Sequence, residues 1–152
     1  MTQALAHPDP LRRIRAVRAP ADAALVVMLS DPDPRVLSTV VHALGQLGDP
    51  VATTRLAALL GDPRVAAAHL VDALSRMGGS AVESLAPVLD NPSVPARVAA
   101  LETLGRIGAV YAGQDVRVAD LIGPAGRRGL DRALQVPDLA PLARRLLDLH
   151  PT

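Results

Sequence analysis

Apolar residues recur at every third position in three segments of the chain, and these segments lie 30 residues apart. The equivalent positions form three columns: Val41, Val71 and Leu101; Leu44, Leu74 and Leu104; and Leu47, Met77 and Ile107. Residues three or four positions apart lie on one face of an α-helix, so each segment is predicted to be a helix with one apolar face. Each segment then reaches a glycine, at Gly48, Gly78 and Gly108. Glycine adopts the left-handed conformation that commonly ends a helix, so we expect these helices to stop there.

Short segments rich in aspartate and proline precede these helices. They are residues 31–34, 61–63 and 90–93, with a fourth copy at residues 7–10. Aspartate and serine side chains accept hydrogen bonds from the free N–H groups of a first helical turn, and proline fits there because its missing donor is not needed. A second, shorter apolar helix is predicted in each repeat, over residues 20–29, 50–60 and 79–89. Because the connections are short, each pair of helices is predicted to form an antiparallel hairpin.

The repeat pattern weakens after Gly108. Further helices are predicted over residues 115–122, 127–136 and 138–150. Residues 123–126, with the sequence Gly-Pro-Ala-Gly, are predicted to break the chain between the first and the second of these. The last two helices are expected to form one more hairpin.

Hairpins of this size cannot bury their apolar faces alone, whereas a row of stacked hairpins forms a continuous core. No segment shows the alternation and the β-branched enrichment of a strand. The predicted fold class is therefore all-α, a right-handed α-solenoid of stacked antiparallel helical hairpins. We expect one domain over residues 1–152, with regular repeats over about residues 5–108. Residues 109–152 are expected to be an atypical C-terminal cap, because a terminal repeat faces water on one side.

Composition and charge narrow the classes of function. The 152 residues are 49% hydrophobic, with Tyr111 as the one aromatic residue and no cysteine. This composition excludes intrinsic disorder, a disulfide framework and cysteine-ligated zinc. The sequence has neither an apolar run long enough for a membrane helix nor a signal peptide, so we expect a cytoplasmic protein without a membrane partner. The 16 basic residues, all arginine, and the 15 acids give a net charge of +1, which provides no general attraction to nucleic acid.

Two columns on the first helices are polar. One contains His42, Asp72 and Glu102, and the other, four residues further on, contains Gln46, Arg76 and Arg106. An acid four residues before a base forms a favourable pair on a helix surface, worth about 0.2–0.5 kcal/mol. The simplest interpretation is a solvated outer face with small ion pairs. The alternative, a polar ladder that binds a partner, stays open.

No motif for catalysis or metal binding is found. The histidines are His7, His42, His69 and His150, and they lie in different columns or near the ends of the chain. Such histidines are not expected to converge on one ion. The sequence has no Gly-x-Ser-x-Gly elbow and no P-loop. We therefore expect no catalytic residue, no metal and no cofactor, and a protein that is not an enzyme.

The repeats resemble HEAT repeats, in the short form of the bilin-lyase-like HEAT family. The resemblance rests on residues 31–50, which begin Asp-Pro-Asp-Pro-Arg-Val and end Ala-Leu-Gly-Gln-Leu-Gly-Asp-Pro, and on residues 99–108, which keep the same frame. It implies a scaffold or adaptor with a concave face lined by the second helices. One HEAT enzyme, deoxyhypusine hydroxylase, holds iron with repeated His-Glu pairs. Here His42 precedes alanine and His69 precedes leucine, so that activity is not expected.

The faces of the second helices opposite their buried leucines are the predicted binding surface for a protein or peptide. They carry Thr54, Arg55, Ala58, Glu83, Ser84 and Pro87. Arg55 is the expected anchor, because arginine is enriched among the residues that dominate binding energy.

Nucleic acid is the alternative partner. It would contact the terminal arginines, Arg12, Arg13, Arg15, Arg18, Arg127 and Arg128. This alternative is disfavoured because the chain has no tryptophan or phenylalanine to stack on a base and because its middle repeats are net negative. A third possibility is an accessory subunit of an enzyme such as a lyase. The oligomeric state stays open.

Overall fold

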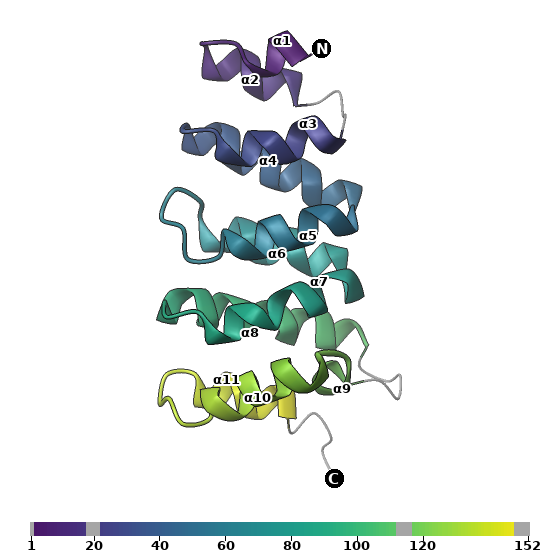
Figure 1. Ribbon diagram of the computed structural model, residues 1–152, viewed down its shortest axis with the longest axis vertical. Coiled ribbons are helices and arrows are strands. Elements are labelled where there is room, and N and C mark those ends of the chain that lie inside the picture. Colours follow the sequence, from purple (N-terminus) through teal and green to yellow (C-terminus); the bar gives the residue numbers. More distant parts are fainter. Residues whose placement is uncertain (1, 18–21, 112–116, 148–152) are drawn as a thin grey trace.

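The computed structural model describes residues 2–17, 22–111 and 117–147, and every regular element in these ranges is helical. The α-helices are α1 (Thr2–Leu5), α2 (Pro10–Ala16), α3 (Asp22–Val27), α4 (Pro34–Leu47), α5 (Pro50–Ala58), α6 (Ala67–Met77), α7 (Gly79–Leu85), α8 (Val94–Val110), α9 (Val118–Leu121), α10 (Gly123–Ala133) and α11 (Ala140–Leu147). Two short 3₁₀-helices are η1 (Met28–Ser30) and η2 (Pro87–Asp90). Helical hairpins stack one after another along the long axis of the molecule (Figure 1). None of those described combines the length and the hydropathy needed to cross a membrane.

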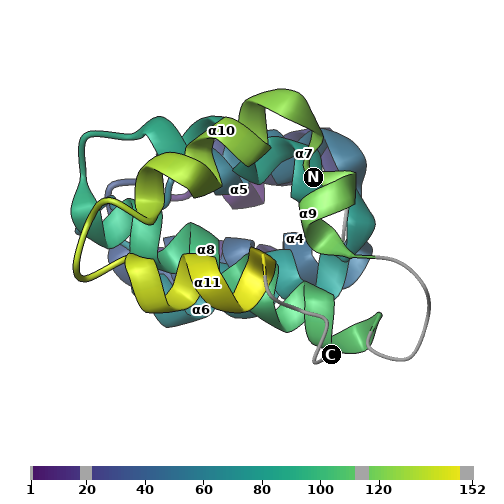
Figure 2. The same ribbon diagram turned by 90° about the horizontal axis from the view of Figure 1, so that it is seen from below.

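The stack has two layers, which Figure 2 shows end-on. In the first-helix layer, α2, α4, α6, α8 and α11 pack one after another. The second-helix layer contains α3 with η1, α5, α7 with η2, and α10. The short helix α9 contacts helices of both layers. This arrangement is the predicted all-α solenoid of stacked antiparallel hairpins.

The leucine column that dominates the sequence pattern lies in the core. Leu44, Leu74 and Leu104 occupy equivalent positions of α4, α6 and α8, and each has an exposed fraction of 0%. The predicted equivalence of these leucines is therefore confirmed, and burial of each side chain contributes about 1.5–3 kcal/mol. The third apolar column is less uniform, because Leu47 is 42% exposed. Leu47 is in the last turn of α4. Helix α2, which packs beside α4, has seven residues against fourteen in α4, so α2 does not cover this last turn.

Polar side chains from three of the four predicted start segments cap a helix, and Asp49 caps α5 in the same way. Asp9, Asp33, Asp49 and Ser93 each accept a hydrogen bond from a backbone N–H in the first turn of α2, α4, α5 and α8, respectively. The third repeat differs, since α6 begins only at Ala67. Asp62 instead accepts from the N–H of Arg64 and forms a turn that precedes the buried Val65. The apolar side chain of Val65, which follows this turn, packs into the core.

Two of the three predicted glycine stops are confirmed. Gly48, with φ of 67°, ends α4, and Gly78, with φ of 61°, ends α6. The prediction for Gly108 is wrong, because this residue is buried inside α8, which continues to Val110. Gly48 and Gly78 are followed by Asp-Pro and Gly-Ser, whereas Gly108 is followed by Ala-Val, which extends a helix.

The predicted second helices are present with small changes. Residues 50–60 contain α5, and residues 79–89 contain α7 followed by η2. The helix tightens into a 3₁₀ turn at Pro87, which cannot donate a backbone hydrogen bond. The described part of residues 20–29 forms α3 and η1.

The C-terminal part departs most from the prediction. Within the described residues, the predicted helix at 115–122 is reduced to the short α9. The predicted break at residues 123–126 is instead the start of α10, because Gly123, with φ of 74°, redirects the chain and Pro124 fits the first turn. Helix α10 joins the second-helix layer beside η2, and α11 joins the first-helix layer beside α8.

A glycine inside α10 permits this packing. A β-carbon on Gly129 would lie 2.7 Å from Cβ of Leu89 in η2, which is closer than real contacts allow. The glycine that weakens the intrinsic helix propensity of this segment is therefore the residue that lets α10 approach its neighbour.

Asp33, which caps α4, is expected to make the stability of the protein depend on pH. The side chain and the backbone N–H of Arg35 both donate to the carboxylate of Asp33, and these hydrogen bonds lower the pKa of Asp33 to about 2. The stabilisation by this carboxylate is present above its unfolded pKa of about 3.9 and is lost as the pH falls through about 2. NMR titration of the Asp33 carboxyl carbon should show this low midpoint. The Arg35→Ala variant should raise the midpoint toward the unfolded value, and an unchanged midpoint would contradict the assigned cause.

Candidate interaction surfaces

The residues predicted to bind a partner lie together on the outside of the second-helix layer. Thr54, Arg55 and Ala58 of α5 are exposed, as are Glu83 of α7 and Pro87 of η2, and Ser84 is half-buried. Helices α5 and α7 pack side by side, so the six residues form one surface, which we call the second-helix face. The hydroxyl of Ser84 lies 3.0 Å from that of Thr53 and 3.3 Å from that of Thr54, and these hydrogen bonds link the two repeats.

An apolar stripe crosses the second-helix face. Val27, Ala58 and Pro87 follow equivalent leucines in successive repeats, and all three side chains are exposed. Val27 is 74% exposed, which is unusual for a large apolar residue. The sequence analysis did not single out Val27, although the alignment of the leucine pairs placed it in this column. The face therefore combines an apolar stripe with polar neighbours, as protein-binding surfaces do.

The arginines of α10 lie in this same layer. Arg127 and Arg128 are exposed, and Arg127 is 3.6 Å from a carboxylate oxygen of Asp120. Arg132, one turn further on, forms an ion pair with Asp90 of η2. Two groups of candidate residues that are at least 40 positions apart in the sequence thus belong to the same layer of the molecule.

The N-terminal arginines do not form one cluster. Arg12 and Arg15 are exposed on α2, in the first-helix layer at the opposite end of the stack from α10. Arg18 lies outside the described residues. The arginines proposed to contact nucleic acid are therefore split between the two layers and the two ends of the molecule.

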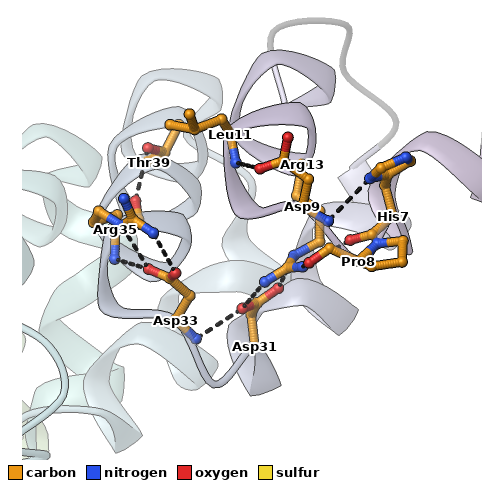
Figure 3. Close-up of polar contacts among 9 residues, drawn as sticks. All are labelled: His7, Pro8, Asp9, Leu11, Arg13, Asp31, Asp33, Arg35 and Thr39. Atoms are coloured by element: carbon orange, nitrogen blue, oxygen red, sulfur yellow. Dashed lines mark hydrogen bonds and ion pairs between the residues drawn. The ribbon is translucent and has the colours of Figure 1, made fainter.

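Arg13 is held inside a polar network between the first two repeats (Figure 3). Its Nε lies 2.7 Å from Oδ2 of Asp31, and its Nη2 donates to Oδ1 of Asp31 at 3.0 Å. Its Nη1 also donates to the carbonyl oxygen of His7. The side chains of Arg13 and Asp31 are only 11% and 8% exposed, so this guanidinium joins repeats and does not face solvent. The two residues are 18 positions apart, and no repeat column in the sequence signals the pair.

The polar columns line the outside of the first-helix layer. Nε of Arg76 lies 3.2 Å from Oδ2 of Asp72, which confirms the first predicted ion pair. The second predicted ion pair is not among the contacts of the described residues, and the side chains of Glu102 and Arg106 are both exposed. A side-chain hydrogen bond of 3.0 Å joins His42 and Gln46 in the equivalent position of α4.

Two open grooves lie between neighbouring helices of this layer. One, of about 320 Å³, lies between α4 and α6 and is lined by His42, His69 and Asp72, among others. The hydroxyl of Ser38 bridges toward Nδ1 of His69 at 3.2 Å across this groove. The other, of about 420 Å³, lies between the C-terminal halves of α6 and α8. Across residues 2–17, 22–111 and 117–147, no group of three or more histidine or carboxylate side chains is arranged to hold a metal ion.

Comparison with known proteins agrees with this architecture. The family model for HEAT repeats matches residues 1–75. The same hairpin stacking continues through the later described helices, so the described chain has an all-α solenoid fold whose N-terminal part, residues 1–75, is similar to HEAT repeats. No curated protein matches the sequence.

Proposed function

We propose that this protein is a non-enzymatic scaffold or adaptor that binds a protein or peptide partner on its second-helix face. The observation that carries the proposal is that Thr54, Arg55, Ala58, Glu83 and Pro87 are exposed, and Ser84 half-buried, on the neighbouring helices α5, α7 and η2. We also propose that the repeats are of the short bilin-lyase-like form, as their 30-residue period suggests. We propose further that residues 1–152 act as one interaction unit.

The chemistry of this face suits a protein partner of moderate affinity. An apolar stripe supplies area for burial, and the flanking hydroxyl, carboxylate and guanidinium groups supply hydrogen bonds at its edge. Arg55 is exposed on this face, and a guanidinium there can donate two parallel hydrogen bonds to one carboxylate.

Nucleic acid is less well supported as a partner. Arg13 is engaged by Asp31, and the exposed N-terminal and C-terminal arginines lie at opposite ends of the stack. Arg127 and Arg132 also face carboxylates. A duplex would need a continuous positive surface, because phosphate contacts dominate its affinity. A role as the accessory subunit of an enzyme remains compatible with the proposal, since that enzyme would be the protein partner.

The proposal predicts that Arg55→Ala and Glu83→Ala weaken partner binding without lowering Tm. A photo-reactive amino acid at position 58 would capture the partner in the source cell. The exposed position 141 of α11, in the other layer, is the control site. Calorimetric titration of that partner should give an affinity about tenfold lower for Arg55→Ala, since an arginine anchor contributes 1–2 kcal/mol or more. An unchanged affinity for both variants would show that the second-helix face is not the binding surface. A steep linear fall of log affinity with log salt would instead support nucleic acid.

A further inference from the structure

A second surface lies on the other side of the molecule, in the first-helix layer. It is the groove of about 420 Å³ between the C-terminal halves of α6 and α8. The groove is separate from the second-helix face, because the two layers form opposite sides of the stack (Figure 2). Its lining has two chemical parts, a pair of guanidinium groups and an apolar wall.

The guanidinium groups belong to Arg76 and Arg106. These residues occupy the same column of adjacent, packed helices, and both line the groove. Arg76 uses its Nε toward Asp72, and 48% of its side chain is exposed, so its terminal nitrogens remain at the surface. Arginine presents five N–H donors in a planar fork that matches a carboxylate. The two side chains therefore supply donors for acidic groups entering from neighbouring repeats.

The apolar wall is formed at the end of α8. Val110 is 72% exposed, and Ile107 and the half-buried Tyr111 stand beside it in the lining. Gly78, which ends α6 and precedes Gly79, also lines the groove and adds no side chain to it. The hydroxyl of Tyr111 lies close to Gly79, since a β-carbon on Gly79 would be 3.3 Å from it. An apolar side chain of a ligand can pack on this wall while a neighbouring carboxylate reaches the arginines.

The local charge disfavours a polyanion, whereas the two arginines in the lining offer separate sites for two acidic side chains. Asp72 lines the same groove, and Glu102 is exposed one turn before Arg106, so acids balance the arginines. A nucleic-acid backbone would place phosphates against these carboxylates. Two separate acidic side chains of a peptide can instead each contact one arginine. Adjacent helices lie about 8–10 Å apart, which a peptide in the polyproline-II conformation crosses in about three residues, and side chains three positions apart then lie on the same face.

We propose that this groove binds a linear peptide segment of a protein partner that carries two acidic residues about three positions apart and an apolar residue between them. The carboxylates bind Arg76 and Arg106, and the apolar side chain packs on Val110 and Tyr111. This surface goes beyond the second-helix face and gives the chain two separate binding sides.

A peptide-display selection on the full-length protein tests the proposal. We expect enriched sequences to contain the acidic–apolar–acidic pattern. A synthetic peptide with the enriched sequence should bind about tenfold or more weakly to the Arg76→Gln/Arg106→Gln variant in fluorescence polarisation. The matched control is Arg144→Gln/Arg145→Gln, which changes two exposed arginines of α11 and should leave the affinity unchanged. Val110→Ser should weaken binding several-fold.

Several results would overturn this inference. One is a selection that enriches no acidic pattern, and another is equal affinity of the peptide for the wild type and the double glutamine variant. Loss of peptide binding in Arg55→Ala but not in Arg76→Gln/Arg106→Gln would assign the peptide to the second-helix face and would leave the proposed function intact. If a single-stranded DNA of about 20 nucleotides displaced the peptide and bound more tightly than the peptide, the groove would be a nucleic-acid site instead. Circular dichroism of each variant confirms that the comparison is made on folded protein.

Discussion

Replacing Leu74 with alanine is expected to lower the free energy of unfolding by about 2–5 kcal/mol, since the change removes a fully buried side chain and leaves a cavity. Leu74 lies in α6, which packs between α4 and α8. A solenoid is stabilised by contacts between neighbouring repeats, so a defect in the middle weakens both interfaces of that repeat. Urea unfolding followed by circular dichroism measures this loss.

The control for this experiment is Val51→Ala. Val51 lies at the start of α5 and is 68% exposed, so its truncation should change the free energy of unfolding by no more than about 0.5 kcal/mol. Equal effects of Leu74→Ala and Val51→Ala would mean that the leucine column is not the interior of the stack.

The second large effect comes from two glycines at equivalent positions of different repeats. A β-carbon on Gly45 in α4 would lie 2.7 Å from Cβ of Ala73 in α6, and 2.8 Å from its Cα. Because the obstructing atoms belong to a helix backbone and its first side-chain carbon, α4 and α6 would have to move apart. Gly45→Ala is therefore expected to destabilise the protein by about 1–3 kcal/mol.

Gly105 in α8 is the matched control. A β-carbon there would have nothing within 4 Å, and the residue is inside a helix. Gly105→Ala should stabilise the protein by about 0.5–1 kcal/mol, because alanine loses less backbone entropy than glycine on forming a helix. The two substitutions should thus shift Tm in opposite directions in a thermal melt. Shifts of the same sign would show that close packing of α4 on α6 does not set the requirement at Gly45.

The two binding sides proposed for this protein have different chemistry. The second-helix face has an apolar stripe with scattered polar groups, whereas the groove between α6 and α8 pairs two arginines with an apolar wall. A rod with separate sites on its two layers can hold two partners at once. Variants at Arg55 and at Arg106 therefore allow each side to be tested without changing the other.

Local signals in the sequence were sufficient for most of the helices. Asp33 caps α4 and Gly48 ends it as predicted, because both effects depend on the backbone of one or two neighbouring residues. The leucine column was also readable, since a period of 30 residues repeats the same interior position. Gly108 was misread because a glycine permits a stop without requiring one.

The candidate surfaces were only partly readable. The position of Thr54, Arg55 and Glu83 on the outside follows from helical periodicity, and the structure places them on neighbouring helices. The burial of Arg13 against Asp31 was not readable, since it depends on how one repeat meets the next. The groove between α6 and α8 could not be predicted either, because its shape also depends on how two repeats pack together.

The sequence alone determined that this chain forms helices, where several of them begin or end, and which of their faces are apolar, because these properties depend on residues within a few positions of each other. Only the tertiary structure decided that α10 enters the second-helix layer, that Arg13 is engaged between repeats, and that Arg76 and Arg106 line one groove. Those outcomes depend on the distances between helices, and these distances are set by the size of the side chains at each contact, such as Gly129 against Leu89 and Gly45 against Ala73.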